Sequence, residues 1–177
     1  MQQHRRRLDQ VLDPGFVQGL DDLDLDALRD RRNVAVEVEN ELSYYRRLLY
    51  GRMDLIKYEQ KRRAGEETRS LVDALVDILT DPARTDGSGS RGQRHIVTDL
   101  PPLPDVGKRE IDAVMADDVL LRTDDVTDEE LEASIDAYQS KVSEINEQRL
   151  VAQDVIDRLT DLITQRFQAE SASSTED

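Results

Sequence analysis

Two long stretches of this chain carry apolar residues at alternating steps of about three and four. The first runs from about Leu25 to about Arg63, and the second follows Thr127 and runs to about Phe167. This spacing puts the apolar side chains on one face of a helix and is typical of helices that share a narrow seam. The sequence therefore predicts two long helices, each with a stripe for a partner helix.

The composition suits a seam better than a globular core. Of the 177 residues, 36% are charged, 37% are hydrophobic and only 4% are aromatic, with no Trp. Such a chain has little material for a globular core and enough for paired helices. We expect an all-α fold: an antiparallel coiled-coil helical hairpin of two long helices, with short accessory helices and a flexible linker.

Changes of composition along the chain predict five segments. They are a flexible N-terminal arm, the first long helix with a following helical segment, a flexible linker rich in Gly, Ser and Pro, short helices with the second long helix, and a polar disordered tail. Their ranges are, in this order, 1–22, 23–80, 81–107, 108–168 and 169–177.

Local signals mark the expected helix ends. Asp22 or Asp24 is placed to cap the first long helix, and Thr127 with Glu130 forms a capping box before the second. A break or bend is expected at 64–67. The apolar pattern that follows it fits either a separate helix or a continuation of the first.

A polar row lies beside each apolar stripe. The first row follows steps of four, three, four and four residues and consists of Glu39, Ser43, Arg46, Tyr50 and Asp54. The second repeats the last three steps and consists of Asn146, Arg149, Gln153 and Asp157. On helices these steps gather the side chains on one face. Two such rows, on helices packed side by side, would build a shared polar cleft.

Arg149 occupies a position where the second stripe calls for an apolar residue. Burial of a guanidinium there would lower the stability of the fold by on the order of several kcal/mol, unless the group is paired or faces a ligand. One interpretation is an ion pair with Asp54, Glu39 or Asp157, or a side chain that reaches the surface. The other is a ligand: guanine offers the acceptors O6 and N7, which an Arg fork matches, and donors that suit a carboxylate.

Charge limits the partners. With 24 basic and 39 acidic residues, the net charge of −15 disfavours direct DNA or RNA binding and favours a basic protein surface. The chain has no cysteine and only two histidines, so we expect no metal site. It shows no secretory signal and no apolar run that would span a membrane, which predicts a cytoplasmic protein.

The first row resembles the E-x3-S-x2-R-x3-Q-x3-D signature of the RsiG family of actinobacterial anti-sigma factors. Glu39, Ser43, Arg46 and Asp54 match, and Tyr50 stands where the family has Gln. In the second row Arg149, Gln153 and Asp157 match. Asn146 replaces Ser there, and Val142 replaces Glu.

The resemblance implies an antiparallel coiled coil that holds a dimer of cyclic di-GMP, with the nucleotide bridging to a WhiG-type sigma factor. It implies that Arg46, Asp54, Arg149 and Asp157 read guanines. The other row residues would support them or contact phosphates. The departures at Tyr50, Val142 and Asn146 leave an alternative open: a diverged AmfC-type paralogue, of the kind named for aerial mycelium formation, that has lost the ligand or the sigma factor.

Two readings from other classes remain. A structural coiled-coil adaptor, or a homodimer through the same seam, explains the stripes without a ligand. An enzyme is not expected, since the chain lacks a nucleophilic Cys, a Gly-rich phosphate loop and an enclosed pocket.

Overall fold

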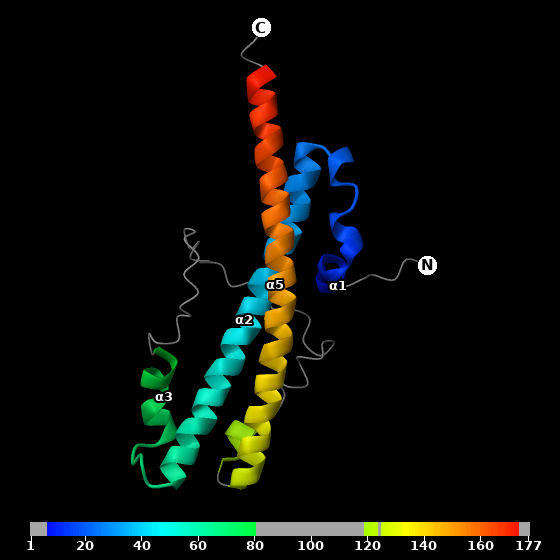
Figure 1. Ribbon diagram of the computed structural model, residues 1–177. Coiled ribbons are helices and arrows are strands. Elements are labelled where there is room, and N and C mark those ends of the chain that lie inside the picture. The colour runs from blue at the N-terminus through cyan, green and yellow to red at the C-terminus, as the bar shows by residue number, and fades with distance from the viewer. Residues whose placement is uncertain (1–6, 81–118, 124, 174–177) are drawn as a thin grey trace. The chain divides into compact units, whose positions relative to one another are not determined.

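The computed structural model describes residues 7–80, 119–123 and 125–173 of the chain. Its longest elements are two helices, α2 (Leu25–Arg63) and α5 (Asp128–Ser173) (Figure 1). No strand occurs within these described ranges. The prediction of a helical chain with two long helices is confirmed there, and α2 has the predicted bounds.

Shorter elements accompany the long helices. In chain order they are α1 (Arg7–Leu12), the 3-10 helices η1 (Pro14–Val17) and η2 (Leu20–Asp22), α3 (Leu71–Thr80) and the 3-10 helix η4 (Val119–Leu121). The chain divides into two compact units. The first comprises residues 1–45 and 143–177, and the second comprises residues 46–142.

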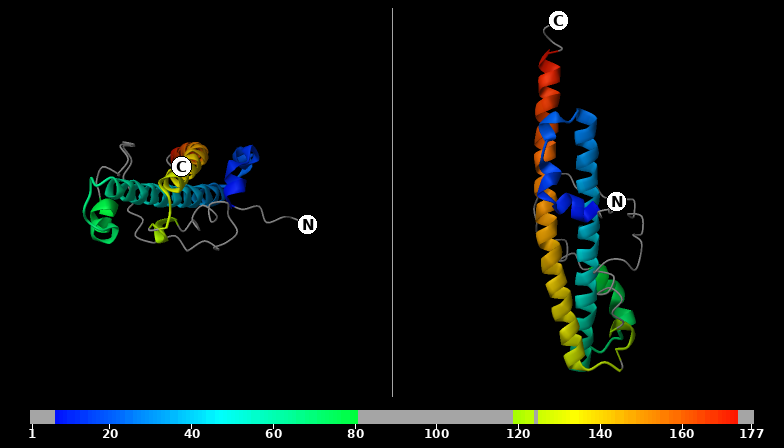
Figure 2. Two further views of the ribbon diagram at one scale, coloured as in Figure 1. Left: turned by 90° about the horizontal axis from the view of Figure 1, so that it is seen from below. Right: turned by 90° about the vertical axis from the view of Figure 1, so that its right-hand side faces the viewer.

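In the first unit, the N-terminal part of α2 lies beside the C-terminal part of α5 (Figures 1 and 2). Arg32 Nε donates to Thr160 Oγ1 over 2.9 Å, and Glu39 on the next turns of α2 pairs with Arg149, earlier in α5. The buried apolar residues of α2 and α5 in this unit are Leu28, Ala35, Val38, Leu42, Tyr45, Ile145, Ala152, Val155 and Leu159.

The N-terminal segment of the first unit is more ordered than the flexible arm predicted for 1–22. Residues 7–22 form α1, η1 and η2, and Val11 of α1 is buried. Arg31 of α2 donates to the Phe16 carbonyl over 2.9 Å and stacks on its ring at 5.7 Å. Pro14 is the first residue of η1, and residues 7–22 are helical over most of their length where a flexible arm was expected. Residues 1–6 lie outside the described part.

The predicted polar tail also differs. Helix α5 continues through 169–173, so the first half of the segment 169–177 is helical, and 174–177 lies outside the described residues. Ser171 Oγ donates to the Phe167 carbonyl over 2.8 Å, one turn earlier in the helix. The helix thus continues for about two turns beyond Phe167, at 3.6 residues per turn.

In the second unit, the C-terminal part of α2 lies beside the N-terminal part of α5 (Figure 1). Arg52 Nη1 donates to the Tyr138 hydroxyl over 3.3 Å, and the two side chains also stack at 6.0 Å. The buried apolar residues on these two elements are Leu49, Met53, Ile56, Tyr58, Leu131, Ile135, Tyr138 and Val142.

Helix α2 ends in a Schellman motif, which separates it from α3. The amide of Gly65 donates to the Arg62 carbonyl and that of Glu66 to the Lys61 carbonyl, over 3.1 and 3.0 Å. Gly65 has a φ of 78°, a conformation that glycine adopts without the penalty of a Cβ. The segment after the break is therefore a separate helix. The linker 81–107 and residues 108–118 lie outside the described part.

The predicted caps are found at the starts of both long helices. Asp24 Oδ1 accepts from the Ala27 amide over 2.7 Å, so Asp24 caps α2. Thr127 Oγ1 accepts from the Glu130 amide and the Glu130 carboxylate accepts from the Thr127 amide, over 3.2 and 2.8 Å. Across the described ranges, no helix has the length and apolar character needed to cross a membrane.

Candidate functional site

The two polar rows meet at the carboxylate of Glu39 in the first unit. Arg149 donates to Glu39 Oε1 from Nε over 3.1 Å and from Nη2 over 2.9 Å. Ser43 Oγ donates to the same oxygen over 2.9 Å, and Gln153 Nε2 reaches it at 3.4 Å. We call Glu39, Ser43, Arg149 and Gln153 the Glu39 cluster.

The local sequence puts this cluster at the margin of the seam. On α2, Glu39 follows the buried Val38, and Ser43 follows the buried Leu42. On α5, Arg149 lies four residues after Ile145 and three before Ala152, both buried. The Glu39 and Arg149 side chains are 18% and 19% exposed. They are thus partly shielded from water, which strengthens the ion pair relative to a surface pair.

The other residues of the second row flank the cluster on α5. Asn146 is half-buried one turn before Arg149, and Asp157 is exposed one turn after Gln153. The α5 row therefore presents one helix face that passes from a half-buried amide, through the guanidinium of Arg149, to an exposed carboxylate. That face offers donors beside the seam and an acceptor toward solvent.

The rest of the first row belongs to the second unit. The guanidinium of Arg46 lies over the Tyr50 ring at 5.3 Å, and the Tyr50 side chain is 38% exposed. Asp54 lines an open hollow of about 530 Å³ on the α2 side of the α2–α3 turn. Its other lining residues are Lys57, Tyr58, Gln60, Lys61, Ala64 and Glu66. Arg46 and Tyr50 thus form one stacked pair, and Asp54 lies by the hollow.

The structure shows which carboxylate pairs with Arg149. Of the three carboxylates considered as its partner, Glu39 is the one that pairs with it. The structure brings together four of the nine predicted site residues in the Glu39 cluster and stacks two others on each other. For all nine residues the ligand role remains a prediction.

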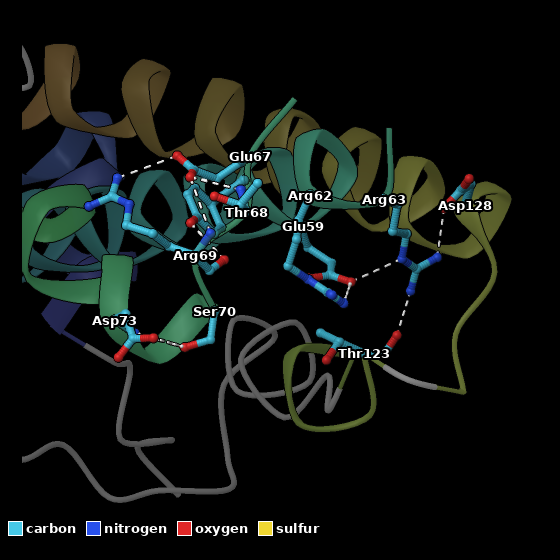
Figure 3. Close-up of polar contacts among 11 residues, drawn as sticks. Glu59, Arg62, Arg63, Glu67, Thr68, Arg69, Ser70, Asp73, Thr123 and Asp128 are labelled. Carbon is cyan, nitrogen blue, oxygen red and sulfur yellow. Dashed lines mark hydrogen bonds and ion pairs between the residues drawn. The ribbon is translucent and has the colours of Figure 1, made fainter. Parts of the chain in front are cut away.

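A second charged cluster was missed by the sequence analysis. Glu59 of α2 is only 1% exposed, and its carboxylate accepts from Arg62 Nε and Nη2 over 2.8 Å and from Arg63 Nε over 3.0 Å (Figure 3). Arg63 also donates to Asp128 Oδ1 over 2.6 Å and to the Thr123 carbonyl. The hydrogen bond from Arg62, with that from Arg63, lowers the pKa of Glu59.

Heptad counting would have found Glu59. It lies two heptads after the seam residue Tyr45, with Arg52 between them at the same position. A carboxylate at a seam position followed by arginines three and four residues later is a self-contained ion-pair motif. Buried charge in this unit is thus satisfied mainly within α2, with Arg63 extending it to the start of α5.

Arg166 of α5 is the other missed residue. It donates to the backbone carbonyls of Leu20, Asp21 and Leu23, which lie just before α2. Three backbone carbonyls in and just after η2 thereby gain a cationic donor. Arg166 is two heptads after Ala152, so seam counting again marks the position, although not the backbone partners.

Comparison with known proteins bears on the first row. No curated protein matches the chain. The family model described as RsiG-like matches residues 14–79, a range that includes every residue of the first row and none of the second. Because the match covers the Glu39 side of the cluster together with Arg46, Tyr50 and Asp54, it agrees with the resemblance read from the sequence and supports membership of this chain in the RsiG family.

Proposed function

We propose that the chain is a cyclic di-GMP-responsive anti-sigma factor that sequesters a WhiG-type sigma factor. The fold we propose for it is an antiparallel coiled-coil hairpin of α2 and α5, with the nucleotide dimer held between the two helices. The RsiG-like match to residues 14–79 supports the anti-sigma class. The protein would act by binding, without catalysis.

The observation that carries the proposal is the convergence of both polar rows on the Glu39 cluster. Two helices contribute to it: Glu39 and Ser43 come from α2, and Arg149 and Gln153 come from α5. A ligand bound there would contact both helices and depend on their pairing. Arginine is also the side chain that best matches the O6 and N7 acceptors of guanine.

The roles of the residues follow the chemistry of the ligand. Arg149 and Asp157 would read a guanine from α5, through acceptor and donor edges of the base. By the resemblance, Arg46 and Asp54 would do the same from α2, with Tyr50 beside Arg46. Ser43, Asn146 and Gln153 would hold the phosphates or support the guanidinium, and Glu39 would orient Arg149.

The charge of the chain supports a basic partner. A net charge of −15 would attract the DNA-facing regions of a sigma factor and repel DNA itself. Association driven in this way would weaken as salt rises, because exposed charges are screened over about 8 Å at physiological ionic strength. The same sequestration would keep the sigma factor from DNA.

A second candidate is a diverged AmfC-type paralogue or coiled-coil adaptor that binds neither the nucleotide nor the sigma factor. The ion pair of Arg149 with Glu39 favours it, because this pair satisfies the guanidinium without any ligand. A homodimer through the seam belongs to the same class. A ligand titration separates the two candidates.

Calorimetric titration of the purified chain with cyclic di-GMP tests the proposal. The Arg46→Ala, Arg149→Ala double variant should lose detectable binding, since each truncated charged contact costs about 1–3 kcal/mol. Glu132→Ala, at an exposed position of α5 outside both rows, is the matched control and should bind normally. Unimpaired binding by the double variant would overturn the site, and no binding by the unmodified chain would favour the second candidate.

A further inference from the structure

Glu39 contacts only one of the two edges on which Arg149 can donate a pair of hydrogen bonds. Its Oε1 accepts from Nε and Nη2, the two nitrogens of the lateral edge of the guanidinium. The terminal edge consists of Nη1 and the second N–H of Nη2, and Nη1 donates no hydrogen bond to any described residue. A planar fork fixed along one edge has its other edge fixed as well.

We propose that Glu39 is a positioning residue, which holds Arg149 so that its terminal edge meets the O6 and N7 acceptors of a guanine. This inference rests on the proposed function and assigns a specificity role to the Glu39 cluster. It concerns how one base is distinguished from another, whereas the total affinity also includes contacts to phosphates.

The surroundings of Glu39 fit a holding role. Ser43, one turn later on α2, donates to the same Oε1 atom over 2.9 Å and so fixes the carboxylate from its own helix. Gln153 reaches that oxygen from α5. With its partners on two helices and only 18% of its side chain exposed, Glu39 has little freedom to turn away from Arg149.

Base discrimination follows from the chemistry of the terminal edge. Guanine presents two acceptors to a guanidinium, but adenine presents N7 with an amino donor in place of O6. A fixed Arg149 edge would therefore favour cyclic di-GMP over cyclic di-AMP. A freely rotating Arg149 would keep its attraction to phosphate and lose most of this preference.

The test is a pair of titrations, with cyclic di-GMP and with cyclic di-AMP, on the unmodified chain, Glu39→Ala and Glu39→Gln. For Glu39→Ala we expect affinity for cyclic di-GMP to fall about 10-fold, within the range that a bidentate base contact supplies, and that for cyclic di-AMP to change less than about twofold. Glu39→Gln keeps an acceptor oxygen for Arg149 and should recover most of the preference. Glu147→Ala removes one exposed carboxylate two residues before Arg149 and controls for charge.

The outcomes separate the inference from the proposed function. If the unmodified chain binds cyclic di-GMP and both Glu39 variants keep its preference for guanine, the positioning role is wrong and the function stands. A Glu39→Ala variant that binds cyclic di-GMP more tightly would also overturn it, by showing that Glu39 competes with the ligand. If the unmodified chain binds neither nucleotide, the proposed function and this inference both fail. Far-ultraviolet circular dichroism identifies any variant that does not fold.

Discussion

Arg63, the last residue of α2, donates to the carboxylate of Asp128, the first residue of α5, over 2.6 Å. The same guanidinium donates to buried Glu59 one turn earlier. Within the second unit, a single arginine therefore joins the end of one long helix to the start of the other, and it also neutralises a buried carboxylate. Charged contacts therefore join α2 to α5 at this point, whereas buried apolar residues do so along the rest of the seam.

Replacement of Glu59 should destabilise the protein. Glu59→Gln removes the charge that Arg62 and Arg63 share, and we expect a loss of about 2 kcal/mol in the free energy of unfolding. This is below the 3–5 kcal/mol typical of a broken buried pair, because both arginines are partly exposed. Urea denaturation of Glu59→Gln beside Glu132→Gln, an exposed control on α5, measures the difference. Equal stabilities of the two variants would contradict the structural role of Glu59.

The contribution of Glu59 should depend on pH. The hydrogen bond from Arg62 lowers the pKa of Glu59 below its ordinary value of 4.5, so the folded state holds this carboxylate ionised more firmly than the unfolded state does. The stabilisation is therefore complete above that ordinary value and is lost as the pH falls through the lower pKa of the folded state. The stability gap between the unmodified chain and Glu59→Gln should narrow as the pH is lowered below 4.5.

Glu67 does not disturb this comparison. Its pKa is also lowered, by hydrogen bonds from Arg69, but it is present in both proteins and its effect cancels. A gap that stayed constant from pH 7 to pH 3 (about the range in which carboxylates titrate) would mean that Glu59 acts through packing rather than charge.

Gly65→Ala should cost about 1 kcal/mol. A Cβ at this position meets no atom within 4 Å, so the whole loss would come from the φ of 78° that the Schellman motif requires. Gly65→Asn should lose less, because Asn tolerates the left-handed conformation better than Ala. Thermal unfolding of the three proteins checks the order Gly, Asn, Ala. An Ala variant as stable as the unmodified chain would show that α2 does not depend on this end.

Arg149→Leu separates a ligand role from a structural one. Leucine suits the apolar seam, which favours the fold, but it leaves Glu39 with only Ser43 and Gln153 as donors, which disfavours it. Because the two effects oppose each other, we expect the free energy of unfolding to change by less than about 1 kcal/mol. Binding of cyclic di-GMP should disappear. A variant that is clearly more stable and still binds the nucleotide would make Arg149 a structural residue. Arg149→Lys, which keeps the charge and loses the fork, should bind weakly.

Periodicity predicted the two long helices well because helix formation and capping depend on residues close together in the sequence. The apolar spacing predicted the bounds of α2. The caps, Asp24 and the Thr127–Glu130 capping box, could be recognised from the sequence alone. Order at 7–22 was not predictable in this way. It depends on tertiary contacts: that of Arg31 with Phe16, 15 residues earlier, and those of Arg166 with carbonyls at η2, far away along the chain.

The sequence predicted which residues form the Glu39 cluster better than it predicted which of them pair with one another. The repeated spacing picked out Glu39, Ser43, Arg149 and Gln153 from two helices, and the structure places them on one carboxylate oxygen. Which of three carboxylates Arg149 would choose depended on the register between α2 and α5. A register is fixed by side-chain packing along the whole seam, which a row of polar residues does not encode.

Co-purification with a WhiG-type sigma factor, with and without cyclic di-GMP, is the decisive test of nucleotide-dependent sequestration. Our prediction is a complex that forms only when the nucleotide is present and that weakens as salt is raised. Formation of the same complex without the nucleotide would contradict it and make the polar rows structural. No complex under either condition would also contradict it and would support a diverged paralogue with a different partner.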